Sequence, residues 1–74
     1  MAIHPINAID VNRQEVVVSF SNGSVILYEE LKGSLNFRQC ILKPYTLGSK
    51  AKFIGDEVIF IVHLDHVDLY MKSQ

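Results

Sequence analysis

Two runs of β-branched and aromatic residues flank the pair Asn22-Gly23 in the stretch QEVVVSFSNGSVILYE, residues 14–29. Asn-Gly best tolerates the positive φ angles of a two-residue type I′ turn, so we predict a β-hairpin with this pair as its loop. In that register one face of the hairpin carries Val16, Val18, Phe20, Val25 and Leu27. The opposite face is mixed and carries Val17, Ser19, Ile26 and Tyr28.

Strand character also appears on either side of this hairpin. Upstream, Ile6–Val11 is separated from the hairpin by a short polar segment, which predicts a three-stranded antiparallel meander. Downstream, Lys52–Ile54 and Glu57–Val62 flank Gly55-Asp56, which predicts a second hairpin with a short turn. The run Val58–Val62 has no polar break, as is typical of a strand covered on both faces.

The middle segment, residues 29–46, has an approximate helical spacing of apolar side chains. Leu31, Leu35 and Leu42 are near that spacing. Gly33 interrupts the pattern, and Pro44 must end any helix because proline lacks the backbone donor. We therefore predict one short helix or an irregular segment here.

Two histidines and two aspartates fall within the octet HLDHVDLY, residues 63–70. The imidazole and carboxylate groups of His63, Asp65, His66 and Asp68 would suit zinc, manganese or iron, and His63, Asp65 and His66 are the leading candidates. Neither a regular strand nor a regular helix brings the four polar side chains of the octet together, however, and the HExxH spacing of zinc proteases is absent. A metal-dependent enzyme at these residues is therefore kept only as an alternative.

Helix-start chemistry explains more of the same octet. Asp65 can serve as the N-cap with Asp68 at the third helical position, where a carboxylate favours the positive helix end. Leu64 and Leu69 then have the spacing of a hydrophobic staple. We predict a strand-to-helix junction followed by a short C-terminal helix that docks on the sheet, and no metal site.

Hydrophobic residues make up 49% of the 74-residue chain and charged residues 20%. This apolar content exceeds that of a disordered segment, and the length suits a single domain, residues 1–74. The predicted fold class is α+β. We expect a small twisted antiparallel sheet of about five strands, a meander plus a hairpin, with a short middle helix and a short C-terminal helix.

The formal net charge of −1 gives no long-range field that would attract phosphate backbones or anionic lipid. Basic residues do gather in the segment Lys43–Lys52, which is predicted to be a loop. There Tyr45 could stack on a base while Lys50 and Lys52 grip phosphates, so nucleic-acid binding is a second hypothesis. The competing interpretation is a solvated loop.

Cys40 is the single cysteine, so an internal disulfide is excluded and a reducing compartment is expected. We predict that it fills the core; the alternative is a nucleophile with His63 or His66 as its base. No apolar run approaches the roughly 20 residues that span a bilayer, and no signal peptide is recognisable. The expected location is the cytoplasm, without a membrane partner. No GxSxG, P-loop or GxGxxG motif occurs, which predicts no catalytic residue and no cofactor.

The order VVVSFSNGSVILYEEL, then KAKFIGDEVIFI, then HLDHVDLY resembles the small bacterial proteins of domain-of-unknown-function family 2442. Phe60 stands where that family usually has tryptophan, and Glu29 where it has aspartate. The resemblance implies an α+β fold of a small twisted sheet with short helices. It also implies that some members lie beside toxin-like or regulatory partners, and it carries over no catalytic residue.

Together these patterns favour a non-enzymatic bacterial or phage protein that binds another protein, in an antitoxin-like or regulatory pair, or binds itself as a homodimer. Small sheets have unpaired edges that invite strand addition. The predicted contact surface is an exposed sheet edge or the mixed face around Tyr28.

Overall fold

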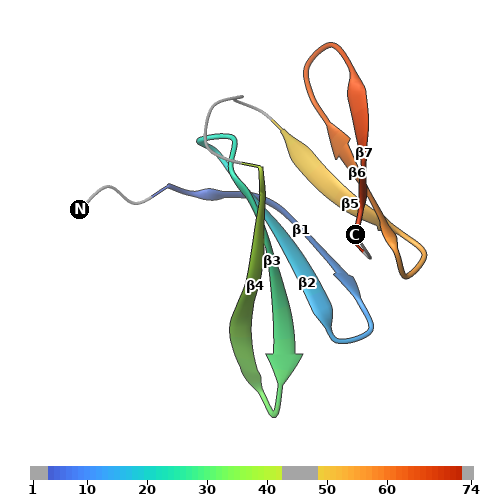
Figure 1. Cartoon of the computed structure of the whole chain (residues 1–74). Coiled ribbons are helices and arrows are strands. Elements are labelled where there is room, and N and C mark those ends of the chain that lie inside the picture. The colour runs from blue at the N-terminus through green and yellow to red at the C-terminus, as the bar shows by residue number, and fades with distance from the viewer. Residues whose placement is uncertain (1–3, 43–48, 73–74) are drawn as a thin grey trace.

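The computed structural model describes residues 4–42 and 49–72, and these form seven strands in two antiparallel meanders (Figure 1). The first sheet has the order β1-β2-β3-β4 and the second the order β5-β6-β7. The strands are β1 (Ile6–Asn12), β2 (Glu15–Phe20), β3 (Val25–Leu31), β4 (Ser34–Leu42), β5 (Lys50–Ile54), β6 (Val58–Val62) and β7 (Val67–Met71). The predicted α+β class is therefore wrong, because the described residues are all-β.

The first two hairpin predictions are confirmed in place, but the register of one of them is wrong. The β2–β3 loop has three residues, because the N–H of Gly23 donates to the Phe20 carbonyl and the N–H of Phe20 to the Ser24 carbonyl. Gly23 has φ 93°, as expected where a type I turn is followed by a left-handed residue. With this longer loop Leu27 pairs with Val17, whereas a two-residue loop would pair Leu27 with Val18. A slip of one residue exchanges the two faces of β2, so Val17 rather than Val16 enters the core.

The middle segment is a strand and not the predicted helix. β4 pairs with β3 across the turn Lys32-Gly33, and both turn residues have positive φ angles (52° and 83°). The N–H of Gly33 also donates to the carboxylate of Glu30 at 2.6 Å. Leu35 and Phe37 alternate with polar residues at the strand period of two, and this alternation outweighs the looser helical spacing. The predicted helix end at Pro44 lies outside the described residues.

The C-terminal segment is also a strand. β7 pairs with β6 around the two-residue turn Leu64-Asp65, where the N–H of His63 donates to the carbonyl of His66 at 2.8 Å. Leu64 and Leu69 are 88% and 63% exposed and form no staple. The residues that fit a helix start also fit a strand, because apolar residues in VDLYM recur at every second position. Pairing with β6 favours the strand over the helix.

β6 itself is covered on one face only. Ile59 and Ile61 are buried in the core cluster, whereas Phe60 and Val62 are exposed on the opposite face. The prediction that Val58–Val62 is covered on both faces is therefore wrong. An uninterrupted apolar run did mark a strand, but its outer residues face away from the first sheet.

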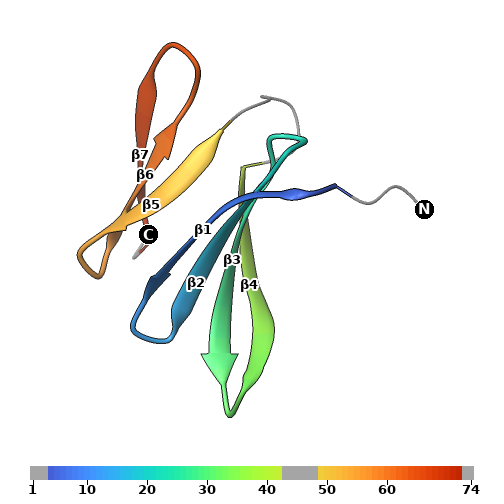
Figure 2. The ribbon, with the colours of Figure 1, turned by 180° about the vertical axis from the view of Figure 1, so that it is seen from behind.

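The two sheets meet along β5, which lies beside β1 and β2 in both views (Figures 1 and 2). Side chains of the first sheet bond to every second residue of the β5 edge. Asn7 donates to the Ser49 carbonyl (3.1 Å), Ser19 Oγ accepts from Ala51 N–H (2.8 Å), Asp10 accepts from Phe53 N–H (2.7 Å), and Asn12 donates to the Gly55 carbonyl (2.9 Å). These bonds occupy an edge that would otherwise accept another strand.

Within residues 4–42 and 49–72 the structure contains no helix long and apolar enough to cross a membrane.

Candidate functional site

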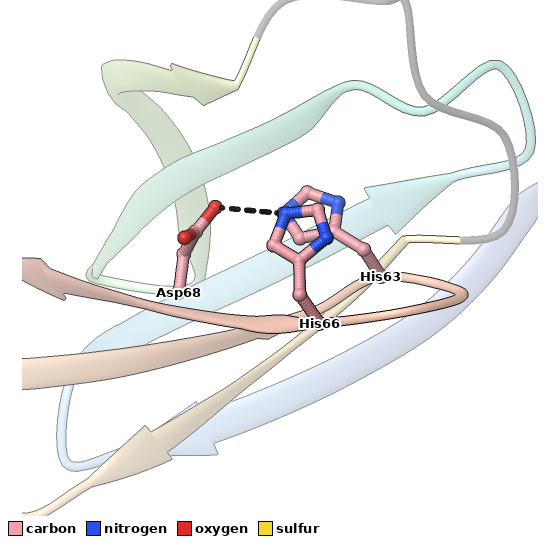
Figure 3. A group of neighbouring side chains, drawn as sticks. All are labelled: His63, His66 and Asp68. Carbon is pink, nitrogen blue, oxygen red and sulfur yellow. Dashed lines mark hydrogen bonds and ion pairs between the residues drawn. The ribbon is translucent and has the colours of Figure 1, made fainter.

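The turn between β6 and β7 brings His63, His66 and Asp68 together (Figure 3). His63 and His66 bracket the turn and lie opposite each other across the ladder. Asp68 is two residues beyond His66, so its side chain lies on the same face of the sheet. We call these three residues the histidine cluster.

His63 is buried (8% exposed) and both of its ring nitrogens have partners. Nδ1 is 3.0 Å from Ser49 Oγ, and Nε2 is 3.0 Å from Asp68 Oδ2. An ionised carboxylate only accepts, so Nε2–H donates to Asp68; in the neutral ring, Nδ1 is then the acceptor that faces Ser49 Oγ. The two bonds fix the ring orientation of His63.

His66 stacks on His63 from the solvent side, with ring centroids 4.2 Å apart and planes at 19°. Its Nδ1 donates to Asp65 Oδ1 at 2.6 Å, and its Nε2 is 3.6 Å from Asp68 Oδ2. The hydrogen bond to Asp65, together with the negative charges of Asp65 and Asp68, raises the pKa of His66. The same hydrogen bond and the charge of His66 lower the pKa of Asp65.

Ser49, His63 and Asp68 form a chain of the groups used in nucleophilic serine catalysis. Ser49 is fully buried, however, so an external carbonyl group cannot approach its Oγ. The chain of hydrogen bonds therefore suits holding His63 in place rather than attacking a substrate. That the protein is not an enzyme stays a prediction.

The sequence pointed to His63, Asp65 and His66 as metal candidates, and the structure changes one member of this set. The donor atoms of His63, His66 and Asp68 lie within 4.8 Å of one another, while Asp65 contacts the far side of the His66 ring. Asp68 was considered as a ligand with the two histidines but was assigned to a helix start, because a regular strand and a regular helix were tested and a hairpin turn was not. Two histidines separated by two turn residues are the signal that could have found it.

The predicted binding residues are spread over both sheets. Lys50 and Lys52 are exposed on β5 and line a cleft of about 370 Å³ together with Asp10 and Val62. Tyr28 is half-buried on β3, opposite Val16 and Phe37. Tyr45 lies outside the described residues. Nucleic-acid binding by the lysines stays a prediction.

Cys40 is exposed on β4, and its thiol donates to the Leu42 carbonyl at 3.6 Å. The prediction that it fills the core is wrong. Its strand belongs to the first sheet and the histidines lie at a turn of the second, and within residues 4–42 and 49–72 no contact joins the thiol to a histidine.

A second feature is the apolar surface on the side of the β5–β7 sheet that faces away from the first sheet. We call this surface the outer face. Phe60 pairs with Leu69 and Val62 with Val67 across the ladder, so their exposed side chains are neighbours. The exposed apolar residues of the outer face are Ile54, Phe60, Val62, Val67, Leu69 and Met71. Contiguous apolar surface of this kind marks an interaction site in soluble proteins.

Fold and site together define a small protein of two packed antiparallel meanders with an apolar outer face and a histidine cluster at one hairpin turn. No family model, curated protein or solved structure matches the chain significantly. The resemblance to domain-of-unknown-function family 2442, the antitoxin-like role and the bacterial cytoplasm therefore stay predictions.

Proposed function

We propose that this protein is a non-enzymatic protein-binding module that pairs with a second copy of itself through β7. The observation that carries the proposal is the coincidence of an open strand edge with an exposed apolar face. β7 is an edge of its sheet, and three of its five side chains belong to the outer face.

The backbone of β7 has its unpaired groups at alternate residues. In an antiparallel ladder, hydrogen-bonded pairs alternate with non-bonded pairs. The bonds from His63 N–H to the His66 carbonyl and from Lys72 N–H to the Glu57 carbonyl fix this alternation at both ends of the strand. Val67, Leu69 and Met71 therefore direct their backbone N–H and C=O groups away from β6, and within residues 4–42 and 49–72 no hydrogen bond reaches these groups.

A twofold axis at Leu69 makes this edge complementary to itself. Two β7 strands in antiparallel register pair Leu69 with its own copy and Val67 with Met71, which is the isologous contact of a symmetric dimer. The two outer faces then join into one apolar surface. Asp68 lies opposite Tyr70 in this register, so no like charges within β7 face each other.

Self-association would also stabilise the second sheet, which has only three strands among the described residues. A sheet of three strands with one apolar face exposed is near the minimum for independent stability. Strand addition extends it to six strands and satisfies the outward backbone groups of β7. Among the described strands β1 and β4 are also edge strands. β1 lies against β5, and the exposed Leu35 of β4 lies opposite Glu30 rather than an apolar side chain.

Size-exclusion chromatography with light scattering, over a range of concentrations, tests the proposal. We expect the wild-type chain to reach twice the mass of one chain as concentration rises. Leu69→Lys places a charge opposite its own copy and should remain monomeric. Leu35→Lys is the matched control, because Leu35 is exposed on the β4 edge and should leave the dimer intact. A wild type that stays monomeric, or a Leu69→Lys variant that still dimerises, contradicts the proposal.

A further inference from the structure

We propose that the histidine cluster is a zinc site, with Nε2 of His63, Nε2 of His66 and a carboxylate oxygen of Asp68 as its protein ligands. Two imidazoles and one carboxylate form a donor set that prefers zinc and similar first-row ions over magnesium or calcium. The proposal is independent of self-association, because these side chains lie on the face of the sheet opposite the outer face.

The distances between the donor atoms suit one small ion. Asp68 Oδ2 is 3.0 Å from His63 Nε2 and 3.6 Å from His66 Nε2. Ligand atoms at 2.0–2.1 Å from a tetrahedral zinc ion are about 3.4 Å from one another. Small shifts of the carboxylate would therefore bring both contacts to the distances of a zinc complex.

The remaining ring nitrogens are already held in the manner of zinc-binding histidines. Such histidines donate their second N–H to a carboxylate or another acceptor, which orients the ring. His66 Nδ1 donates to Asp65, and His63 Nδ1 contacts the buried Ser49 hydroxyl. With zinc on Nε2, the His63 proton moves to Nδ1 and is donated to Ser49 Oγ, so both rings present an Nε2 lone pair toward Asp68.

Besides the small shift of the carboxylate and the move of the His63 proton, zinc binding requires a tilt of the His66 ring from the arrangement in Figure 3. The two rings are stacked nearly parallel, and one ion cannot lie along the lone pairs of two parallel rings 4.2 Å apart. His63 is fixed by its burial, whereas the His66 side chain is 54% exposed, which leaves room for its ring to tilt while Nδ1 keeps its bond to Asp65. A water molecule would complete the four ligands, as at zinc sites with three protein ligands.

Calorimetric titration of zinc chloride into the full chain, stripped of metal beforehand, tests this assignment. We expect one zinc ion per chain in the wild type. Cobalt in place of zinc should give the visible absorption of a tetrahedral ion. His66→Ala and Asp68→Asn should abolish binding, while Asp65→Ala, which removes only the support of the His66 ring, should weaken it by about 10- to 100-fold.

Two control variants separate this site from other metal-binding groups of the chain. His4→Ala and Cys40→Ser remove an exposed histidine and the exposed thiol without touching the histidine cluster, and zinc affinity should not change. Leu69→Lys should also bind zinc normally, so a failed dimer and a failed zinc site are distinguishable. Absence of stoichiometric binding in the wild type, or binding that survives His66→Ala, overturns the proposal; so does binding that is lost in a control variant. Because His66 and Asp68 are exposed, loss of binding in their variants can be checked against an unchanged circular dichroism spectrum.

Discussion

The two edge strands of the β5–β7 sheet differ in whether side chains of the first sheet form hydrogen bonds with their backbones. Along β5, side chains of the first sheet bond to the backbone at alternate residues, including Asp10 at Phe53 and Ser19 at Ala51. Along β7, the corresponding positions carry exposed apolar side chains. The difference shows that polar residues within β1 and β2 close one edge of the neighbouring sheet, whereas the other edge is where we propose that a second copy binds.

The largest expected loss of stability follows from removing a side chain that bonds to the β5 edge. Asp10→Ala leaves the Phe53 N–H without its charged acceptor, and hydrogen bonds to charged groups contribute about 1.5–3 kcal/mol. We expect the free energy of unfolding, measured by urea denaturation, to fall by about that amount. A loss of less than about 0.5 kcal/mol, the range of ordinary surface substitutions, would show that the edge bonds contribute little.

A change on the open edge should have a smaller effect on the isolated chain. Leu69→Ala removes an exposed side chain, so we expect the free energy of unfolding to change by no more than about 0.5 kcal/mol in dilute, monomeric solution. Urea denaturation at low and high protein concentration measures both states. The wild type should gain stability with concentration more than the variant does, because only the dimer packs Leu69 against its own copy. Equal concentration dependence would argue against β7 as the contact.

The smallest expected effect is on the pKa of Asp56, which lies at the end of the closed β5 edge. The hydrogen bond from Asn12 and the charge of Arg13 lower the pKa of Asp56 below 3.8. A lowered folded-state pKa stabilises the fold above 3.8, and this contribution is lost as the pH falls through the folded-state pKa. In Asn12→Ala, an NMR titration of the Asp56 carboxyl group should show its pKa closer to 3.8 than in the wild type. An unchanged pKa would mean that Asn12 does not hold this carboxylate.

Much of the strand order could be predicted from local patterns, and two strands could not. β-Branched runs around Asn22-Gly23 and Gly55-Asp56 marked the hairpins, because turn residues and strand residues agree there. β4 and β7 were missed because their apolar residues also fit a helical spacing over a short segment. Choosing between the two periods needs the neighbouring strand, and that tertiary information is absent from a local pattern.

Only part of the candidate site could be predicted, because its assembly also depends on a neighbouring strand. His63 and His66 were recognised by residue type, but Asp68 joins them only because a two-residue turn reverses the chain. Once Asp65 was interpreted as a helix cap, Asp68 was assigned a supporting role in a helix that does not form. The polar residues of β1 and β2 were not assigned a role at all, since their bonding partners are more than 30 residues away in the chain.

Amide hydrogen exchange followed by NMR tests the contrast between the two edges most directly. The N–H groups of Ala51 and Phe53 on β5 should be protected at every protein concentration, because the side chains of Ser19 and Asp10 accept from them within one chain. The N–H of Leu69 should exchange rapidly in dilute solution and become protected as concentration rises and β7 pairs with its copy. Rapid exchange at Ala51 and Phe53, or protection of Leu69 that does not depend on concentration, would contradict the account.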